Sequence, residues 1–248
     1  MKFAEGGRKT LLRVACFWAP ILWGICLSVP VRNDYLRLLM LTLPAVSLLG
    51  WLCATWSRPV VRYGLMAFLA ALIGLFCLPE RDSLSCDSLS QSYAASLRKY
   101  EGTTYHWGGE TRTGIDCSGL IRAAMEDATF WEGLKRGDGR LIRHAANLWL
   151  HDESAQALGE GYRKLTVPVC LAKNLNELDY TVLKVGDLAI AGGGVHILAY
   201  LGDHRWIQAD PGADKVIIEQ APSKNCWFSG AVKIVRWTLL QNGCLAET

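Results

Sequence analysis

The sequence predicts an α+β domain that follows three transmembrane helices. Three observations support this prediction. Uncharged apolar runs fill much of the first third of the chain, helical patterns followed by short β-type runs fill the remainder, and a cysteine at a helix start precedes a histidine at a strand start. Helices that come before antiparallel strands indicate an α+β arrangement, because a parallel sheet would need alternating strands and helices.

The apolar runs that predict transmembrane helices cover about residues 14–31, 38–56 and 63–79. A membrane-spanning helix needs roughly 17–25 apolar residues, and each run reaches that range. A cleavable signal peptide would share the basic N-terminus, but the sequence LSVPVR after the first run lacks a small-residue cleavage pattern. We therefore expect residues 1–80 to anchor the chain in a lipid bilayer, although any one run could instead be a buried core helix.

Basic residues near the ends of the runs predict how the anchor is oriented. Six of them lie on the side that holds the N-terminus and three on the other, namely Lys2, Arg8, Lys9, Arg13, Arg58 and Arg62 against Arg32, Arg37 and Arg81. This bias favours a cytoplasmic N-terminus. Three crossings then place everything after Pro79 outside the cytoplasm, in a multi-pass protein of the inner or cytoplasmic membrane.

The composition gives no support for nucleic acid or metal as a partner. The net charge is only +3, and no basic cluster of the nucleic-acid-binding type occurs. No C-x-x-C pair or His-rich ligand spacing is found, so neither a metal nor another cofactor is expected. The soluble cysteines other than Cys117 could form one or two disulfides or remain free thiols; they are Cys86, Cys170, Cys226 and Cys244.

The soluble part is predicted to begin with a polar, serine-rich linker over residues 81–91 and to continue as one globular domain over residues 92–248. Apolar residues at helical spacing predict helices over 92–101, 118–134 and 141–158. Turn residues then separate the candidate strands, which are 165–170, 188–191, 196–201, 205–210, 215–219 and 232–237.

Cys117 is the candidate nucleophile of the domain. It lies at a predicted helix start, where unpaired backbone N–H groups and the positive end of the helix dipole would stabilise a thiolate. Asp116 would cap this helix. The same N–H groups could bind the oxyanion of a tetrahedral intermediate. A lone cysteine after an aspartate is more often a structural thiol, so the assignment requires a partner.

His196 supplies that partner. It follows the glycines at 192–194 and opens an apolar strand. At such a position an imidazole can project from the end of the strand, while the glycines allow another element to approach closely. A thiol paired with an imidazole is an arrangement that activates cysteine nucleophiles.

A third side chain must hold the His196 ring, as the asparagine does in Cys-His-Asn proteases. The strand that begins at His196 and the next strand resemble a hairpin. Gln208 would face His196 if the hairpin turn centred on Gly202, and Asp210 would do so if it centred on Asp203. The sequence pattern leaves Gln208 and Asp210 as alternatives.

Several blocks of sequence together resemble the NlpC/P60 family of cell-wall cysteine peptidases. They are Tyr105 with Gly108 and Gly109, DCSGL from Asp116, LKVGDLAI from Leu183, VHILAYLGD from Val195 and WIQA from Trp206. The resemblance covers roughly residues 92–210. Its most specific part is the DCSG block followed in order by GDL and a histidine.

The resemblance implies a papain-like α+β fold with helices packed on an antiparallel sheet. It also implies a cysteine endopeptidase that hydrolyses peptide bonds in the stem peptides of peptidoglycan. In that family Cys117 corresponds to the nucleophile, His196 to the general base and Gln208 to the third catalytic position. The positions that match substrate-binding residues are Tyr105, Asp116 and Ser118.

Residues 121–185 separate the cysteine block from the GDL block by more than the usual compact core of the family. This insertion could form a substrate lid or a surface for a partner. Two alternatives to an endopeptidase also stay open. An amidase or acyltransferase would use the same thiol and imidazole, and a non-catalytic membrane scaffold would only bind wall peptides or a protein.

Overall fold

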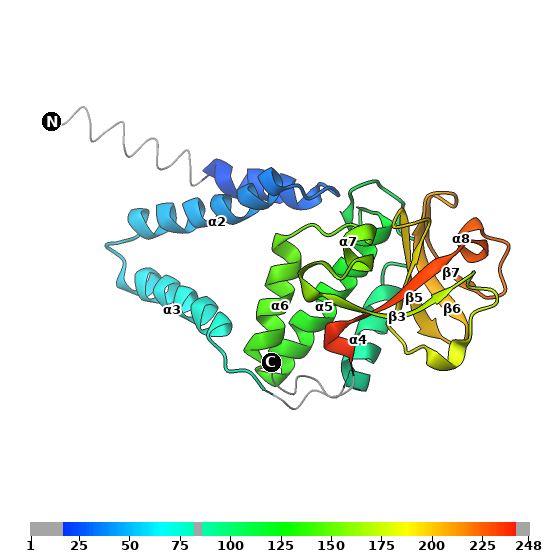
Figure 1. Ribbon diagram of the computed structural model, residues 1–248. Helices are drawn as coiled ribbons and strands as arrows, with labels where there is room; N and C mark the ends of the chain where they lie inside the picture. The colour runs from blue at the N-terminus through cyan, green and yellow to red at the C-terminus, as the bar shows by residue number, and fades with distance from the viewer. Residues whose placement is uncertain (1–16, 82–85, 242–248) are drawn as a thin grey trace. The chain divides into compact units, whose positions relative to one another are not determined.

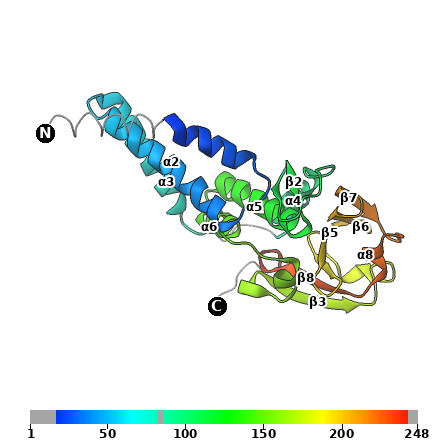
Figure 2. The same ribbon diagram turned by 90° about the horizontal axis from the view of Figure 1, so that it is seen from above.

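The computed structural model describes residues 17–81 and 86–241, and it divides the chain into two compact units, Met1–Cys77 and Leu78–Thr248 (Figures 1 and 2). The first unit is helical throughout most of its described part. The second unit contains the mixed helices and strands of the predicted α+β domain.

The first unit contains a short apolar helix, Phe17–Ser28, followed by the long helices α2 (Asp34–Ala54) and α3 (Pro59–Phe76). Asn33 caps α2, since its side-chain oxygen accepts a hydrogen bond from the Leu36 N–H at 2.9 Å. The proline at the start of α3 lies where a missing N–H costs nothing.

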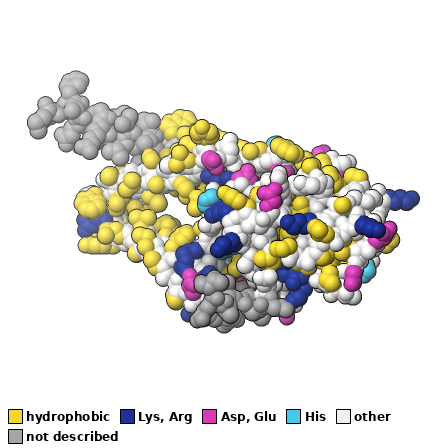
Figure 3. Space-filling model, viewed as in Figure 1, with side chains coloured by type: hydrophobic (Ala, Val, Ile, Leu, Met, Phe, Trp, Pro, Cys, Tyr) yellow, Lys and Arg dark blue, Asp and Glu magenta, His cyan; other side chains and the backbone are white. Residues whose placement is uncertain are grey.

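Two of the three predicted spans are helices long and apolar enough to cross a membrane, namely α2 and α3. The described part of the first helix is shorter, and residues 14–16 of that predicted span lie outside the described residues. Figure 3 shows hydrophobic side chains spread over the surface of α2 and α3. Leu38, Trp51, Val60 and Ile73 are among those exposed.

The second unit is built around a six-stranded antiparallel sheet with the strand order β3-β8-β4-β5-β6-β7. The α+β class and all six predicted strands are confirmed, with ends that differ by no more than two residues. The strands are β3 (Thr166–Ala172), β4 (Leu188–Ala191), β5 (His196–Gly202), β6 (Arg205–Asp210), β7 (Lys215–Gln220) and β8 (Val232–Trp237).

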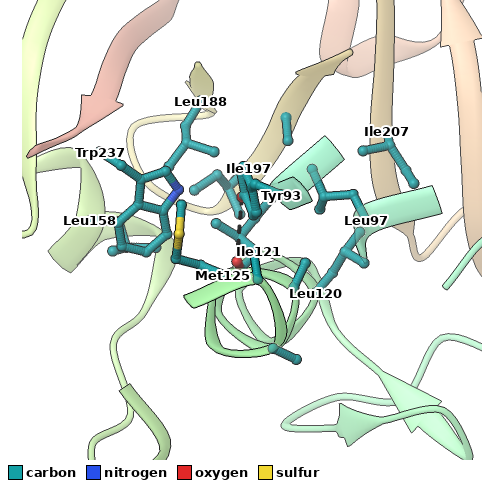
Figure 4. Packing of buried hydrophobic residues seen from close by; sticks show 14 of the residues in the cluster. Tyr93, Leu97, Leu120, Ile121, Met125, Leu158, Leu188, Ile197, Ile207 and Trp237 are labelled. Carbon is teal, nitrogen blue, oxygen red and sulfur yellow. Dashed lines mark hydrogen bonds between the residues drawn. The ribbon is translucent and has the colours of Figure 1, made fainter. Parts of the chain in front are cut away.

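The helices of this unit are α4 (Cys86–Arg98), α5 (Cys117–Arg136), α6 (Gly139–Leu150), α7 (Ala155–Gly159) and α8 (Cys226–Ser229). A small hairpin, β1 (Glu110–Thr111) with β2 (Gly114–Ile115), precedes α5. Single 3-10 turns lie at Tyr162–Lys164, Tyr180–Val182 and Thr238–Leu240. Helices α4 and α5 lie side by side and pack on one face of the sheet (Figures 1 and 4).

Helix α4 begins at Cys86, inside the segment that was expected to be a linker. Between its serines the helix carries an apolar stripe. Leu89, Tyr93 and Leu97 recur every four residues, and all three are fully buried. The serine-rich composition therefore placed the start of this helix too late in the sequence. The spacing of the larger apolar residues extends the helical pattern back to Leu89.

The predicted helix over 141–158 is two helices, α6 and α7, separated by an extended segment. The chain turns at His151, whose backbone is extended, and α7 restarts where Ser154 caps its first turn. Glu153, in the break, is buried and pairs with Arg163 at 2.9 Å. The buried Glu153 side chain and its ion pair hold the chain between the two helices. Helical periodicity alone does not predict this break.

The main core lies between α5, α4 and the sheet (Figure 4). Leu120, Ile121 and Met125 of α5 are fully buried and meet sheet residues such as Ile197 and Ile207. Each such side chain contributes about 1.5–3 kcal/mol when removed from water. A second cluster contains residues of the opposite parity along the same strands, among them Leu198, Trp206 and Ile234, together with Phe228 of α8. The sheet is thus buried on two faces.

The predicted insertion over residues 121–185 belongs largely to this core. Leu141, Leu148 and Leu158, from α6 and α7, are buried in the main cluster. Helix α6 packs closely on α5, because Gly133 leaves room for Ile142. Most of the segment therefore supports the fold.

The loop before α5 touches the first turn of that helix with no room for a side chain. A Cβ on Gly119 would overlap the carbonyl oxygen of Gly109, and a Cβ on Gly109 would overlap the backbone of Gly114. Gly108 has a positive φ of 71°, a conformation that glycine adopts without strain. These contacts explain why glycines occupy the loop and the fourth position of the DCSG block.

We predict that Gly119→Ala destabilises the full-length protein by about 1–3 kcal/mol, because the loop must move away from the new methyl group. The measurement is the melting temperature. Gly230→Ala is the matched control, since Gly230 has a φ of −96° and open space around the position of a Cβ. Equal melting temperatures for the two variants would contradict the steric explanation.

Candidate active site

Cys117 is the first residue of α5, and Asp116 caps that helix as predicted. One Asp116 oxygen accepts hydrogen bonds from the Gly119 N–H at 2.6 Å and the Ser118 hydroxyl at 3.1 Å, and the other accepts from the Gly108 N–H at 2.8 Å. Asp116 thereby joins the glycine loop to the helix start. This arrangement holds the Cys117 sulfur at the N-terminus of α5.

The environment of the Cys117 thiol differs from the expected one. Burial, followed by the negative charge of Asp116, raises the pKa of Cys117 to about 12. Hydrogen bonds from the backbone N–H groups of Ile197 and Ser118 act in the opposite direction but do not compensate. The expectation of a stabilised thiolate is therefore wrong for the resting site, because desolvation outweighs the helix terminus. The thiol is protonated at neutral pH.

His196 opens β5 and lies almost fully buried beside the glycine turn that joins β4 to β5. A Cβ on Gly194 would come within 2.7 Å of Gln156, so helix α7 does approach the turn as closely as the glycines were expected to permit. Burial lowers the pKa of His196, while the hydrogen bond with Gln208 and the charge of Asp210 act in the opposite direction. The imidazole is neutral near pH 7.

The two candidates meet at β5. The backbone N–H of Ile197, the residue that follows His196, is one of the groups that hydrogen-bond to the Cys117 sulfur. Helix α5 packs against β5 in the main core. The structure therefore brings the thiol to the strand end that carries the imidazole.

Gln208, the third candidate residue, contacts the imidazole directly. Its Oε1 lies 2.7 Å from Nε2 of His196, and the Gln208 side chain is fully buried. The β5–β6 register pairs Tyr200 with Trp206, which centres the turn on Asp203. If that register continued, Asp210 would be level with His196, yet the contact is made with Gln208.

The reach of the side chains explains this result. Diagonal neighbours on adjacent antiparallel strands are about 7–8 Å apart at Cα, a gap that a glutamine and an imidazole can close together. Asp210 is held elsewhere, since its carboxylate accepts hydrogen bonds from Asn225 Nδ2 at 2.6 Å and from the Gly212 N–H at 2.7 Å. Gln208 and Asp210 lie on the same face of β6, and of these two alternatives it is Gln208 that contacts His196.

Trp227 and Glu219 complete the surroundings of the imidazole, and the sequence analysis missed both. The Trp227 ring stacks on the His196 ring with centroids 4.2 Å apart and planes 16° from parallel. Glu219 accepts a hydrogen bond from Gln208 Nε2 at 2.7 Å. Pairing β6 with the following strand could have placed Glu219 near Gln208, but no local signal marks Trp227.

The three residues matched to substrate binding all lie around the start of α5. Tyr105 is half-buried, and burial together with the nearby Cys117 and Asp116 raises its pKa to about 12. Its phenol is therefore a neutral hydrogen-bond donor. The Ser118 hydroxyl is occupied by Asp116 in this structure.

The structure also bears on the other cysteines and on possible metal ligands. Cys170 and Cys226 carry free thiols. The side chain of Cys86 and all of Cys244 lie outside the described residues, so the predicted disulfides stay open for them. Within residues 17–81 and 86–241 there is no cluster of three or more His, Cys, Asp or Glu side chains suited to a metal ion.

Comparison with known proteins matches this part of the chain to a known family of domains. A model of the NlpC/P60 family matches residues 102–236. The NlpC/p60 domain of the peptidoglycan hydrolase SagA is 20% identical, over 58% of this chain and 97% of that one, with a TM-score of 0.32. The comparison with curated proteins gave no match.

Two further solved structures are similar over part of their length. The peptidoglycan hydrolase RipB from Mycobacterium tuberculosis is 22% identical, over 60% of this chain and 65% of that one, with a TM-score of 0.36. NlpC2 from Trichomonas vaginalis is 15% identical, over 63% and 49%, with a TM-score of 0.41. The chain therefore spans less than two thirds of these two proteins.

We predict that the His196 imidazole titrates with a midpoint below its ordinary value of 6.5, because burial opposes its protonation. An NMR titration of the full-length protein with labelled histidine measures this midpoint. Trp227→Ala should move it toward 6.5 by letting water reach the ring. A midpoint at or above 6.5 in the unaltered protein would contradict the inferred effect of burial.

Proposed function

The chain belongs to the NlpC/P60 family of cysteine peptidases, and from that premise we propose that it is a membrane-tethered endopeptidase that hydrolyses peptide bonds in the stem peptides of peptidoglycan. One observation carries this proposal: a neutral, buried imidazole, held by Gln208 and covered by Trp227, lies at the strand end that the Cys117 thiol reaches. The names of SagA and RipB, both peptidoglycan hydrolases, support the substrate class.

The proposed reaction begins with a proton transfer. Because both the thiol and the imidazole are neutral at rest, His196 takes the proton from Cys117 as the sulfur attacks the scissile carbonyl. The hydrogen bond between His196 Nε2 and the Gln208 oxygen leaves Nδ1 as the nitrogen with a free lone pair. His196 and Gln208 therefore act as general base and orienting residue.

Backbone N–H groups at the start of α5 stabilise the oxyanion that forms on the carbonyl oxygen. Collapse of the tetrahedral intermediate breaks the peptide bond, and His196 returns its proton to the leaving amine. A thioester then links the substrate acyl group to Cys117. Water, deprotonated by His196, hydrolyses this thioester and regenerates the thiol.

Tyr105, Asp116 and Ser118 are proposed to hold the substrate next to Cys117. The carboxylate of Asp116 suits the amino end of a stem peptide, and the neutral phenol of Tyr105 can donate a hydrogen bond to a carbonyl. Ser118 already contacts Asp116 and would adjust with it. Each of the three lies at or just before the first turn of α5.

The helices of the first unit are proposed to tether the domain, which includes residues 92–248, on the extracytoplasmic side of the cytoplasmic or inner membrane. Helices α2 and α3 present apolar side chains over a length that can cross a bilayer. The peptidoglycan substrate lies on that side of the membrane. With a first crossing near residues 14–31, the predicted bias of basic residues gives the same orientation.

We expect purified full-length protein to release new amines from stem-peptide fragments of peptidoglycan. Cys117→Ala should reduce release to background, and His196→Ala should reduce it by about 10²–10⁴-fold through loss of the base. Cys170→Ala is the control, since Cys170 is a free thiol of β3. No release by the unaltered protein, or equal release by Cys117→Ala, would refute the proposed function.

The mass of the acyl group trapped on Cys117 separates the remaining alternatives. A peptide fragment indicates an endopeptidase, whereas another acyl group indicates an amidase or acyltransferase.

The proposed topology predicts which side of the membrane each position faces. In intact cells, a membrane-impermeant thiol reagent should label Asp87→Cys at the exposed start of α4. Ser57→Cys, in the exposed turn between α2 and α3, should stay unlabelled until the membrane is opened. The parent protein gives the background from its own cysteines. Labelling of Ser57→Cys but not Asp87→Cys would reverse the proposed orientation.

A further inference from the structure

The amide of Gln208 spans two neighbouring strands of the sheet. On one side its oxygen lies 2.7 Å from His196 Nε2, at the start of β5, and on the other its nitrogen lies 2.7 Å from Glu219 Oε2, on β7. The β6–β7 register pairs Gln208 with Ile217, so Glu219 is its diagonal neighbour. Since Gln208 is fully buried, both ends of its amide need these protein partners.

Three donors converge on the Glu219 carboxylate. Gln208 Nε2 and Asn225 Nδ2 donate to Oε2 at 2.7 and 2.8 Å, and the Ser223 hydroxyl donates to Oε1 at 3.1 Å. A carboxylate that receives several donors acts as an acceptor only. The end of the Gln208 amide that faces Glu219 must therefore be the NH₂ group.

The direction of this network is anchored by a backbone group. Asn225 Oδ1 accepts a hydrogen bond from the Trp227 N–H at 3.1 Å, and a backbone N–H can only donate. The other end of the Asn225 amide is thus its NH₂, which donates to both Glu219 and Asp210. Each amide in the cluster has one allowed orientation.

From this network we infer that Glu219 is a positioning residue that selects the tautomer of His196. With the Gln208 NH₂ directed to Glu219, the Gln208 oxygen faces His196 and can only accept. The proton of the neutral imidazole must then lie on Nε2, and the lone pair must lie on Nδ1, where the proposed reaction requires the base. The effect of Glu219 on catalysis rests on the proposed function, whereas the tautomer assigned to His196 does not.

A side chain at 219 without an acceptor would remove this selection. In Glu219→Met no group at 219 accepts a hydrogen bond from Gln208 Nε2, so the Gln208 amide can turn and present its NH₂ group to His196. The imidazole would then carry its proton on Nδ1, which is the wrong nitrogen to accept the thiol proton. Methionine is close to glutamate in length, so it can fill the half-buried position of Glu219.

Glu219→Gln, by contrast, should keep the tautomer. The Asn225 NH₂ faces the same Oε2 position as Gln208 Nε2, so the new amide must place its oxygen there and still accept from Gln208. A residue that only supports the fold would not separate these two variants by whether they keep an acceptor.

The first test measures the tautomer directly. In full-length protein with ¹⁵N-labelled histidine, the two His196 nitrogen shifts, assigned by their absence in His196→Ala, should report the Nε2–H form in the unaltered protein. They should shift toward the Nδ1–H form in Glu219→Met and stay in the Nε2–H form in Glu219→Gln. The same tautomer in the unaltered protein and in Glu219→Met would overturn the inference.

The second test measures turnover of stem-peptide fragments. Glu219→Met should lower kcat by about 10- to 100-fold with KM nearly unchanged, a size typical of residues that orient a catalytic group. Glu219→Gln should keep most of the activity, and Glu177→Met, at an exposed position, should behave as the unaltered protein. Unchanged kcat in Glu219→Met would contradict the catalytic consequence. If even the unaltered protein cleaves nothing, the proposed function fails while the tautomer measurement still decides this inference.

Discussion

The buried hydrogen bond between His196 and Gln208 is the interaction on which the candidate site depends. Both side chains are removed from water, and a buried polar group without a partner costs about 1–3 kcal/mol. The sheet meets this requirement by aligning three strands, β5, β6 and β7, so that one amide joins an imidazole to a carboxylate. Helix α8 closes the cluster, because Asn225 binds the carboxylates and Trp227 covers the ring.

Two opposing effects set the chemistry of the thiol. The start of α5 brings backbone N–H groups to Cys117, which favours a thiolate. Burial and the carboxylate of Asp116 favour the neutral thiol, and their effect is the larger. Asp116 cannot be dispensed with, since it also ties the glycine loop to the helix. A neutral thiol beside a neutral imidazole makes proton transfer part of the attack, which is why the tautomer of His196 matters.

The segment between the cysteine and histidine blocks supports the site by packing behind it. Helix α6 extends the core behind α5, and α7 supports the glycine turn before His196 through Gln156. Most of the insertion that could have formed a lid therefore packs in the core of the domain. Arg122, five residues after Cys117, forms a buried ion pair with Glu110 at 2.9 Å and a second ion pair with the exposed Asp152 at 2.6 Å. These pairs join the β1–β2 hairpin to the segment that follows α6.

The sequence by itself was enough to predict the α+β class, the six strands, the cap at Asp116 and the residues proposed as nucleophile and base. These features follow from local rules: alternation along strands, glycine at tight contacts, and a capping side chain at a helix start. Only the tertiary structure decided that Gln208 rather than Asp210 meets His196, that Trp227 covers the ring, and that burial keeps the thiol protonated. Each of these depends on groups brought together from separate strands and helices, and neither their distances nor their exclusion of water is encoded in any local pattern.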